Sequence, residues 1–269
     1  MEKFEVHILG CGSALPTMRH NPSSQVVNVR NKLFMIDCGE GTQLQLRRSR
    51  LPFTRINHVF VSHLHGDHCF GLMGMISTFG MLHRNGPLFI HSHERLQELL
   101  RPQLDFFCSD IGYEVVFQPF NPSEETIVYD DRSVAVSTIP LSHRIPTCGF
   151  LFREKPTRSM REQGLADTVR SYAYCSDTCY LPKLSEQVKD VSMLYHEATF
   201  SETEQLRAKQ TFHSTARQAA QVAKDACAKR LVIGHFSSRY DDETQILREA
   251  QEVFPSVELA HENMKMEIL

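Results

Sequence analysis

The segment VFVSHLHGDHCFGL, residues 59–72, places four side chains of metal-binding types within six positions. They are His63, His65, Asp67 and His68. Neutral imidazoles and carboxylates bind zinc well, and a His-x-His pair places two imidazoles of one short loop on the same ion. Asp67 and His68 come at the start of the following helix, so they are better placed for a second ion nearby. The segment therefore predicts part of a two-metal site.

Three further side chains of these types follow apolar, strand-like segments elsewhere in the chain. His143 ends STIPLSH, Asp177 ends SYAYCSD and His235 ends RLVIGH. Functional side chains often gather where strands give way to loops. Taken singly, each histidine is more simply explained by a structural hydrogen bond, and Asp177 by a capped turn. Together with the first cluster, five histidines and two aspartates at strand ends predict one metal centre.

The segments that must position these side chains alternate between strand and helix patterns. Apolar residues with a period of two, or in continuous runs between turn signals, predict strands at 4–10, 24–30, 33–37, 56–62, 87–91, 113–120, 126–130, 133–143, 148–154, 171–177, 190–198, 231–237 and 257–262. Helical patterns cover 39–49, 68–83, 93–107, 216–230 and 241–254, and Ser214 or Thr215 is expected to cap the helix at 216–230. This order predicts sheet-on-sheet packing covered by helices, in a single domain spanning residues 1–269.

The composition is that of an ordinary globular protein. Of 269 residues, 41% are hydrophobic and 23% charged, and no apolar run approaches the roughly 18 residues of a membrane span. The N-terminus opens into a strand pattern without a signal peptide, and none of the eight cysteines forms a CxxC pair. We therefore expect free thiols, no membrane association and a cytoplasmic location. The net charge of −3 means that any polyanionic partner must be bound by a local basic patch.

The motifs resemble those of a known family. SHLHGDH carries the HxHxDH signature of the metallo-β-lactamase fold. Four other segments resemble markers of the ribonuclease Z family, the tRNA 3′-processing endonucleases: ILGCGSALPTMRHNPSS, FMIDCGEGTQLQL, YHEATF and FHSTARQAA. The resemblance runs from Phe4 to about His261. It implies an α/β fold of the αββα sandwich type, in which two mixed sheets pack face to face and helices cover the outer faces.

The resemblance also implies a cofactor and a ligand set, namely two zinc ions per chain. The first ion would be held by His63, His65 and His143, the second by Asp67, His68 and His235, and Asp177 would bridge both. Asp67, on the side of the attacking water, would orient that water and accept its proton. His213, in FHST, is the candidate that protonates the leaving oxygen or holds the phosphate; the alternative is a surface histidine at a helix start. Glu197 would orient His213, or serve as a cap or ion-pair partner.

The function implied by the resemblance is endonucleolytic removal of the 3′ trailer from precursor tRNA, leaving a 3′-hydroxyl on the tRNA. The family also implies a homodimer, in which the arm of one subunit serves the active site of the other. An alternative within the same fold is a phosphodiesterase acting on cyclic nucleotides or other small phosphodiesters. A di-iron oxidoreductase is disfavoured because those members replace the second histidine of the motif with a carboxylate, where this chain has His65. A silent RNA-binding protein is disfavoured by the complete ligand set.

Two segments depart from the family pattern. The family has Ser-Gly before the bridging aspartate, where this chain has Cys175 and Ser176. The family's long tRNA-gripping arm corresponds here to a short polar stretch at 155–170, which we expect to be a loop: either the arm is shortened, or this sequence represents it incompletely. A shortened arm favours the small-phosphodiester alternative. Both 155–170 and the run RRSRLPFTR at 47–55 are basic, so either is a candidate for contacts with backbone phosphates.

Overall fold

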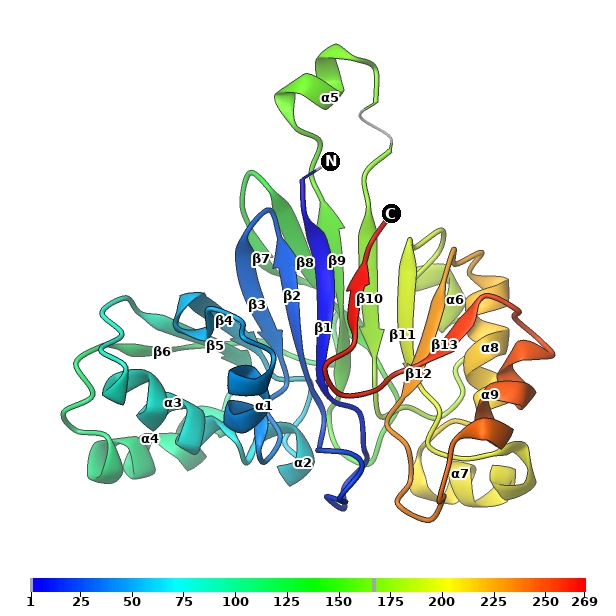
Figure 1. The fold of residues 1–269 in the computed structure, drawn as a ribbon, viewed down its shortest axis with the longest axis horizontal. Helices are drawn as coiled ribbons and strands as arrows, with labels where there is room; N and C mark the ends of the chain where they lie inside the picture. Colours follow the sequence, from blue (N-terminus) through cyan, green and yellow to red (C-terminus); the bar gives the residue numbers. More distant parts are fainter. Residues whose placement is uncertain (1, 166–167) are drawn as a thin grey trace.

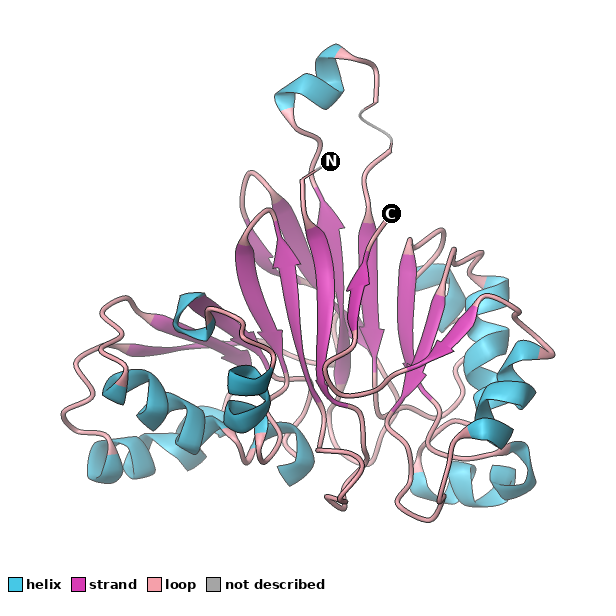
Figure 2. Cartoon of the chain, viewed as in Figure 1, coloured by secondary structure: helices cyan, strands magenta, loops and turns pink. Residues whose placement is uncertain are grey.

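The computed structural model describes residues 2–165 and 168–269. Two seven-stranded sheets pack face to face, and helices cover the outer face of each sheet (Figure 1, Figure 2). The αββα sandwich expected from the sequence is therefore confirmed. Among the described residues, no helix has the length and apolar character that spanning a membrane requires.

The first sheet combines an antiparallel part with a parallel part. In sheet order it comprises β14 (Lys265–Glu267), β1 (Phe4–Gly10), β2 (Ser24–Val29), β3 (Lys32–Ile36), β4 (Ile56–Phe60), β5 (Leu88–Ser92) and β6 (Val115–Pro119). Strands β3 to β6 pair in parallel, so their carboxyl ends meet at one edge. The outer face packs against α1 (Thr42–Arg48), α3 (Leu72–Met81) and α4 (Arg95–Phe107).

The second sheet has the same mixed construction. It comprises β13 (Val257–Leu259), β12 (Leu231–Gly234), β11 (Met193–Glu197), β10 (Ser171–Cys175), β9 (Cys148–Glu154), β8 (Val134–Pro140) and β7 (Ile127–Asp130). Strands β10 to β13 are parallel. On its outer side lie α6 (Leu184–Gln187), α8 (Ala216–Asp225) and α9 (Thr244–Gln251), with α7 (Gln205–Thr211) near the carboxyl ends of the strands.

The period-two pattern of the strands divides the apolar residues between two layers. In β3, Phe34 and Ile36 belong to the core between the sheets, whereas Leu33 and Met35 pack under the helices of the first sheet. The inter-sheet core is aromatic: the Phe34 and Phe152 ring centroids lie 5.8 Å apart in an edge-to-face arrangement. Because both faces of β3 are covered, its sequence is almost continuously apolar.

Most of the predicted helices and strands are present, with differences that have local causes. The helix expected at 68–83 is divided into α2 (Gly66–Cys69) and α3. The break lies at Gly71, where an added Cβ would lie 2.1 Å from the carbonyl oxygen of Gly39, so close contact with that backbone replaces a continuous helix. Thr215, one of the two residues expected to cap this helix, forms a capping box with Gln218 at the start of α8. Strand β14 and the short helices α6 and α7 were not predicted.

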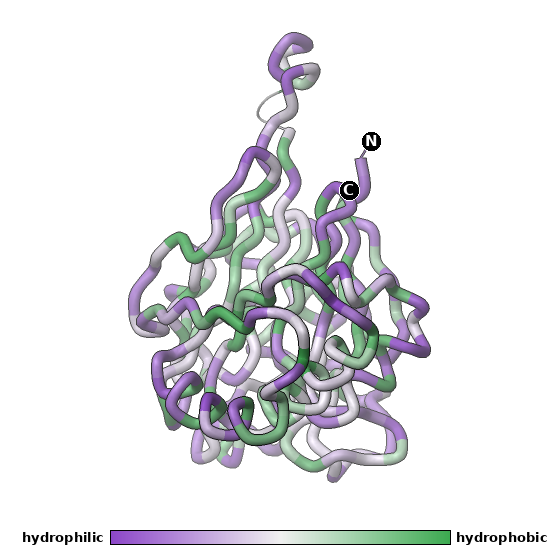
Figure 3. The backbone as a smooth tube through the Cα atoms, turned by 90° about the vertical axis from the view of Figure 1, so that its left-hand side faces the viewer, coloured by the Kyte–Doolittle hydropathy of each residue, from purple (hydrophilic) through white to green (hydrophobic). Residues whose placement is uncertain are grey.

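The expectation of a loop throughout 155–170 is wrong in part. The segment between β9 and β10 contains α5 (Arg158–Glu162), whose start is capped by the Thr157 hydroxyl accepting from the Met160 amide. The hairpin projects beyond the ends of both sheets, and its turn is largely hydrophilic (Figure 1, Figure 3). Residues 166 and 167 lie outside the described part of the chain.

A buried ion pair closes the base of this hairpin. Glu154 ends β9, and its two carboxylate oxygens each accept a 2.8 Å hydrogen bond from the Arg170 guanidinium. The Arg30 guanidinium lies 3.0 Å from the same carboxylate. Burial opposes ionisation of Glu154, but Arg170 and Arg30 hold its pKa below the ordinary value of 4.5. Both ends of the hairpin are thereby fixed to the first sheet.

We expect Glu154→Gln to lower the free energy of unfolding by about 3 kcal/mol at neutral pH, because it removes the carboxylate partner of a buried guanidinium. A carboxyl group with a depressed folded-state pKa stabilises the fold above its ordinary pKa, and this stabilisation is lost as the pH falls through the folded-state value. The difference between wild type and variant should therefore shrink below about pH 4.5. Urea unfolding followed by circular dichroism measures both quantities. Glu125→Gln, an exposed carboxylate, is the control, and an equal difference at neutral and acid pH would contradict the role of the ion pair.

Candidate metal centre

The seven predicted ligands, which come from both sheets, meet at one end of the sandwich. They follow or lie close to the carboxyl ends of strands: His63 and His65 after β4, Asp67 and His68 in α2, His143 after β8, Asp177 after β10 and His235 after β12. Their ligand atoms form two groups, each with all atoms within 4.8 Å of one another: His63, His65, His143 and Asp177, and Asp67, His68, Asp177 and His235. The structure thus brings together every predicted ligand.

Asp177 belongs to both groups and directs one oxygen to each. Its Oδ2 lies 3.7 Å from His63 Nε2 and 3.6 Å from His143 Nε2. Its Oδ1 lies 3.2 Å from His68 Nε2 and 3.1 Å from His235 Nε2. A carboxylate with this disposition of partners has the arrangement of a bridging ligand.

The donor atoms fit divalent metal ions. The Nε2 atoms of His68 and His235 are buried and have no hydrogen-bond partner. In the other group, the Nδ1 of His65 lies 3.0 Å from His63 Nε2 and 3.2 Å from His143 Nε2, so imidazole nitrogens converge on one point. Burial and the neighbouring His68 lower the pKa of His63 well below its ordinary value, which favours the neutral, metal-binding form. Lone pairs directed together in a buried site are what a metal ion satisfies.

Hydrogen bonds at the opposite ring nitrogens determine which nitrogen of each histidine remains free. His143 Nδ1 donates to the carbonyl oxygen of Phe212 at 2.9 Å. His68 Nδ1 donates to Asp37 at 2.7 Å, and His235 Nδ1 lies 2.9 Å from the Thr199 hydroxyl, which itself donates to Glu197. In each case the proton resides on Nδ1, so Nε2 presents its lone pair to the centre.

Asp37 is the site residue for which the sequence assigned no role. It is fully buried and accepts hydrogen bonds from His68 Nδ1, from the Ser62 amide and hydroxyl at 2.8 and 2.9 Å, and from the Tyr174 hydroxyl at 2.8 Å. A signal for it was present, because Asp37 directly follows the strand pattern at 33–36, as the ligands follow theirs.

The backbone turns sharply at three of these strand ends. Asp37, Asp177 and His235 have φ values of 55°, 61° and 60°, a left-handed conformation that is rare for residues other than glycine. A conformation of this kind persists only where surrounding contacts hold it, and it is concentrated at functional sites. Here it directs each side chain out of its strand and into the centre.

His213 and Glu197 lie beside the two metal-binding groups. His213 Nδ1 is 2.9 Å from Glu197 Oε1, and the His213 ring centroid is 5.1 Å from that of His143 and 5.3 Å from that of His235. Glu197 is buried and also accepts from the amides of Thr178 and Ser214. Burial opposes protonation of His213, but Glu197 raises its pKa to about 9. The expected contact between these two residues is confirmed.

A cavity of about 690 Å³ opens onto the centre. It is lined by Asp67, His213 and the loop that follows β1, and three arginines contribute to its wall: Arg144, Arg207 and Arg239. None of the three was singled out from the sequence, because each is isolated among residues of other kinds. The basic run 47–55 does not line this cavity within the described residues. Phosphate contacts close to the centre therefore fall to arginines that only the fold brings together.

The loop after β1 is held in place by a second cluster. His20 Nδ1 lies 3.1 Å from Glu262 Oε2 and 3.3 Å from Cys11 Sγ, and its Nε2 lies 3.4 Å from Glu243. These hydrogen bonds raise the pKa of His20 to about 12, so it is an imidazolium between two carboxylates. The cluster connects the loop that lines the cavity to the C-terminal part of the second sheet.

The fold and this centre define the class of protein: a metal-dependent hydrolase of the β-lactamase superfamily. Residues 32–236 match the model of the family described as "Beta-lactamase superfamily domain". The chain is 55% identical to a "Ribonuclease Z" of Phocaeicola vulgatus over 100% of this chain and 98% of that protein. It is 56% identical to a "Ribonuclease Z" of Bacteroides thetaiotaomicron over 98% of this chain and 95% of that protein. The chain belongs to the ribonuclease Z family, whose members are endoribonucleases.

Solved structures agree with this assignment. The crystal structure of the short form of human tRNase Z superposes with a TM-score of 0.81 at 28% identity, covering 98% of this chain and 99% of that one. The alignment with the P. vulgatus protein spans 304 positions, whereas this chain has 269 residues, so about 35 positions are occupied only in the relative.

We expect Asp37→Asn to weaken metal binding at the group that contains His68 by about tenfold to a hundredfold. The carboxylate fixes the His68 tautomer, and an amide that presents its NH2 group to Nδ1 would favour the wrong one. Competition with a chelating indicator measures the two affinities separately from activity.

The matched control is Asp105→Asn, because Asp105 is an exposed aspartate on α4. It should leave both affinities unchanged. Unaltered binding in the Asp37 variant, with the fold intact by circular dichroism, would show that Asp37 only supports packing.

Proposed function

We propose that this protein is a two-zinc endoribonuclease that removes the 3′ trailer from precursor tRNA and leaves a 3′-hydroxyl on the tRNA. The observation that carries the proposal is the Asp177 carboxylate between two complete groups of ligands, in a chain whose full-length relatives are named "Ribonuclease Z". Endonucleolytic cleavage of a phosphodiester requires an activated water, neutralisation of phosphate charge and protonation of the leaving oxygen. Each of these tasks has a candidate group in the cavity.

The ligand assignment follows the two groups. His63, His65 and His143 would hold one zinc, Asp67, His68 and His235 the other, and Asp177 would bridge. Imidazole-rich sites with carboxylates suit zinc. When bound, the ions supply an activated water and neutralise negative charge that develops on the phosphate. The histidines and aspartates hold that chemistry at the floor of the cavity.

Asp67 is assigned as the proton acceptor. Its Oδ2 lies 3.4 Å from His68 Nε2 and 3.6 Å from His235 Nε2, and its side chain lines the cavity. Burial opposes ionisation, but His68 and His235 hold its pKa well below the ordinary value, so it is a carboxylate at neutral pH. A carboxylate that faces the cavity can orient the attacking water and take its proton.

His213 is assigned to the leaving-group side. Glu197 fixes its ring through Nδ1, which leaves Nε2 for the substrate. An imidazolium in this position can hold a phosphate oxygen or donate a proton to the leaving 3′-oxygen of the tRNA, which becomes the 3′-hydroxyl while the trailer keeps the phosphate. Glu197 acts through His213 and is a positioning residue.

The proposal includes a cytoplasmic homodimer. Among the large apolar side chains that are more than half exposed, four lie in the loop after β1, in α1 and in the turn after α2: Leu15, Met18, Leu44 and Phe70. Leu15 and Phe70 line the cavity itself. Exposed apolar side chains beside a functional site favour coverage by a partner, and a second subunit would supply its hairpin there. The free cysteines suit a reducing compartment.

A second candidate function, hydrolysis of small phosphodiesters, is favoured by one observation. The chain lacks about 35 positions that the P. vulgatus relative has, and the hairpin between β9 and β10 is short. The cleavage chemistry at the metal centre is the same for both substrates. The two functions differ in whether the hairpin contributes to binding.

We expect purified wild type to contain two zinc ions per chain, and Asp67→Ala to lower turnover of precursor tRNA by several orders of magnitude, because a ligand and the proton acceptor are lost together. His213→Ala should retain both ions and still lose about a hundredfold or more in rate. Elemental analysis and single-turnover cleavage of labelled precursor tRNA separate the two effects.

The control for these variants is His83→Ala, because His83 is exposed and lies outside the cavity. If the His213 variant cleaves precursor tRNA at the wild-type rate, His213 is a surface histidine at a helix start and not part of the active site. Iron in place of zinc would overturn the assigned cofactor.

We expect replacement of residues 157–168 by a short Gly-Ser linker, which keeps Glu154 and Arg170, to weaken cleavage of precursor tRNA and to reduce its salt dependence. Each lost phosphate contact removes one counterion-release contribution. Hydrolysis of bis(p-nitrophenyl) phosphate should remain nearly intact, because the metal centre performs the chemistry and the hairpin positions the substrate. Equal losses on both substrates would assign the hairpin to the fold. No loss on either would favour the small-phosphodiester function.

A further inference from the structure

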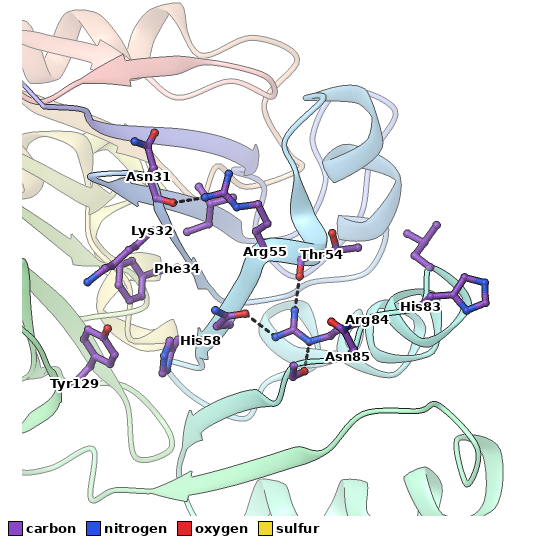
Figure 4. A pocket seen from close by; sticks show the side chains of 14 residues that line it. Asn31, Lys32, Phe34, Thr54, Arg55, His58, His83, Arg84, Asn85 and Tyr129 are labelled. Carbon is purple, nitrogen blue, oxygen red and sulfur yellow. Dashed lines mark hydrogen bonds between the residues drawn. The ribbon is translucent and has the colours of Figure 1, made fainter.

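A second cavity, of about 540 Å³, lies at the end of the first sheet opposite to the metal centre (Figure 4). Lys32 opens β3, and Asn57 and His58 lie at the start of β4; these residues line the cavity. Strands β3 and β4 run in parallel, and their carboxyl ends lead to Asp37 and to the segment that carries His63. The cavity is therefore separated from the metal centre by the length of the strands. Its volume is in the range of small-molecule sites.

The charge of the lining is entirely positive. Lys32, Arg55 and Arg84 contribute to the wall, and no aspartate or glutamate is among the described lining residues. Lys32 already pairs with Asp131, outside the lining. Arg55 is exposed and donates one hydrogen bond, to the Asn31 carbonyl at 3.2 Å, which leaves most of its guanidinium N–H groups available.

Within the described part of the chain, the buried cation Arg84 has no anionic partner. Its side chain donates to four backbone carbonyls and one amide: those of Thr54, Ile56, Gly86 and Pro87, and the Asn57 side chain. It is only 5% exposed, and burial lowers its pKa. Buried charges are ordinarily paired, because desolvation otherwise costs several kcal/mol. All the acceptors of Arg84 are neutral, so its positive charge favours an anion in the adjoining cavity. Because every N–H group of Arg84 already donates a hydrogen bond, Arg55 is the residue that would contact the anion directly.

One wall of the cavity is aromatic. The rings of His58 and Tyr129 lie edge to face with centroids 4.6 Å apart, and Tyr129 packs on Phe34 at 5.1 Å. Burial lowers the pKa of His58 to about 4, so this ring is neutral at physiological pH, and one of its faces is stacked on Phe89 with centroids 5.0 Å apart. Figure 4 shows Phe34, His58 and Tyr129 grouped on one side with Lys32, and Asn31 and Arg55 beside them. Aromatic surfaces of this kind bind nucleobases by stacking or edge contacts.

Amide groups complete the lining. The Asn57 side-chain oxygen accepts from Arg84 at 2.8 Å, which directs its two N–H donors elsewhere. Asn31 and Asn85 are exposed and offer a donor and an acceptor each. Amides paired with an aromatic wall can recognise the edge and the face of a heterocycle, and the guanidinium of Arg55 matches a phosphate.

We propose that this cavity binds a nucleoside monophosphate, with its phosphate at Arg55 and its base against Tyr129 and His58. The site is independent of the metal centre and of the function assigned to it. A single nucleotide suits a cavity whose charge and aromatic surface lie together beside the same two strands. A continuous RNA strand requires instead a groove with an entry and an exit.

The test is isothermal titration of the zinc-loaded full chain with AMP, adenosine and inorganic phosphate. We expect AMP to bind with a Kd below about 1 mM, and adenosine and phosphate to bind at least about tenfold more weakly. Arg55→Ala should weaken AMP binding by about tenfold or more, since it removes the charge-assisted contact. Tyr129→Ala should weaken AMP and leave phosphate unchanged. Arg95→Ala, an exposed arginine on α4, is the matched control and should have no effect.

Four results would overturn the proposal. The first is that wild type does not bind AMP, and the second is that it binds phosphate as tightly as AMP. The third is that AMP binding is lost in His213→Ala but kept in Arg55→Ala. The fourth is that an oligoadenylate binds much more tightly than AMP, and that this tighter binding depends on Arg55. The third result would place the nucleotide at the metal centre, and the fourth would make the cavity part of an RNA path. Neither of these two results bears on cleavage of precursor tRNA, so the proposed function is tested separately. Urea unfolding of each variant checks that the fold is retained.

Discussion

The structure depends above all on one buried carboxylate, that of Asp177, which faces four imidazoles at a place where both sheets end. Burial penalises a lone charge, and His235, His68 and His63 together hold the pKa of Asp177 well below its ordinary value. Such an arrangement is stable only when the strands that carry these residues end together. The sandwich meets this requirement because the parallel strands of each sheet deliver their carboxyl ends to the same side.

A layer of hydrogen bonds around the centre gives the ligands their orientation. Asp37 fixes His68, Thr199 fixes His235 and the Phe212 carbonyl fixes His143, so each ring has one tautomer and one free nitrogen. The surrounding groups are mostly backbone amides and hydroxyls of buried residues. Folding therefore orients the rings toward the centre, and a metal ion that binds there displaces any proton held at Nε2.

The two ends of the sandwich have different chemistry. One end carries the carboxylates and imidazoles of the metal centre, with three arginines in the wall of the same cavity. The other end carries the projecting hairpin and a cavity with lysine, arginine and aromatic side chains. This separation matters in a chain with a net charge of −3, because attraction for a polyanion must be local. The ion pair of Glu154 with Arg170 and Arg30 connects the hairpin to the sheets, so contacts made by the hairpin are transmitted to a rigid base.

The sequence by itself determined the class of the fold and predicted the seven side chains that converge at the candidate metal centre. Metal-binding residues at the ends of apolar runs can be recognised from residue type and spacing, because strands and their ends are local features. Other features depended on contacts between distant segments. Gly71 broke a predicted helix because it packs on Gly39, and Asp37 acquired its role because Ser62, His68 and Tyr174 converge on it. Likewise, Arg144 and Arg239 from two loops and Arg207 from α7 gather at one cavity, and Arg84 donates only to neutral acceptors once β4 and β5 are in place. No local sequence pattern predicts these contacts between distant segments, so only the tertiary structure decided them.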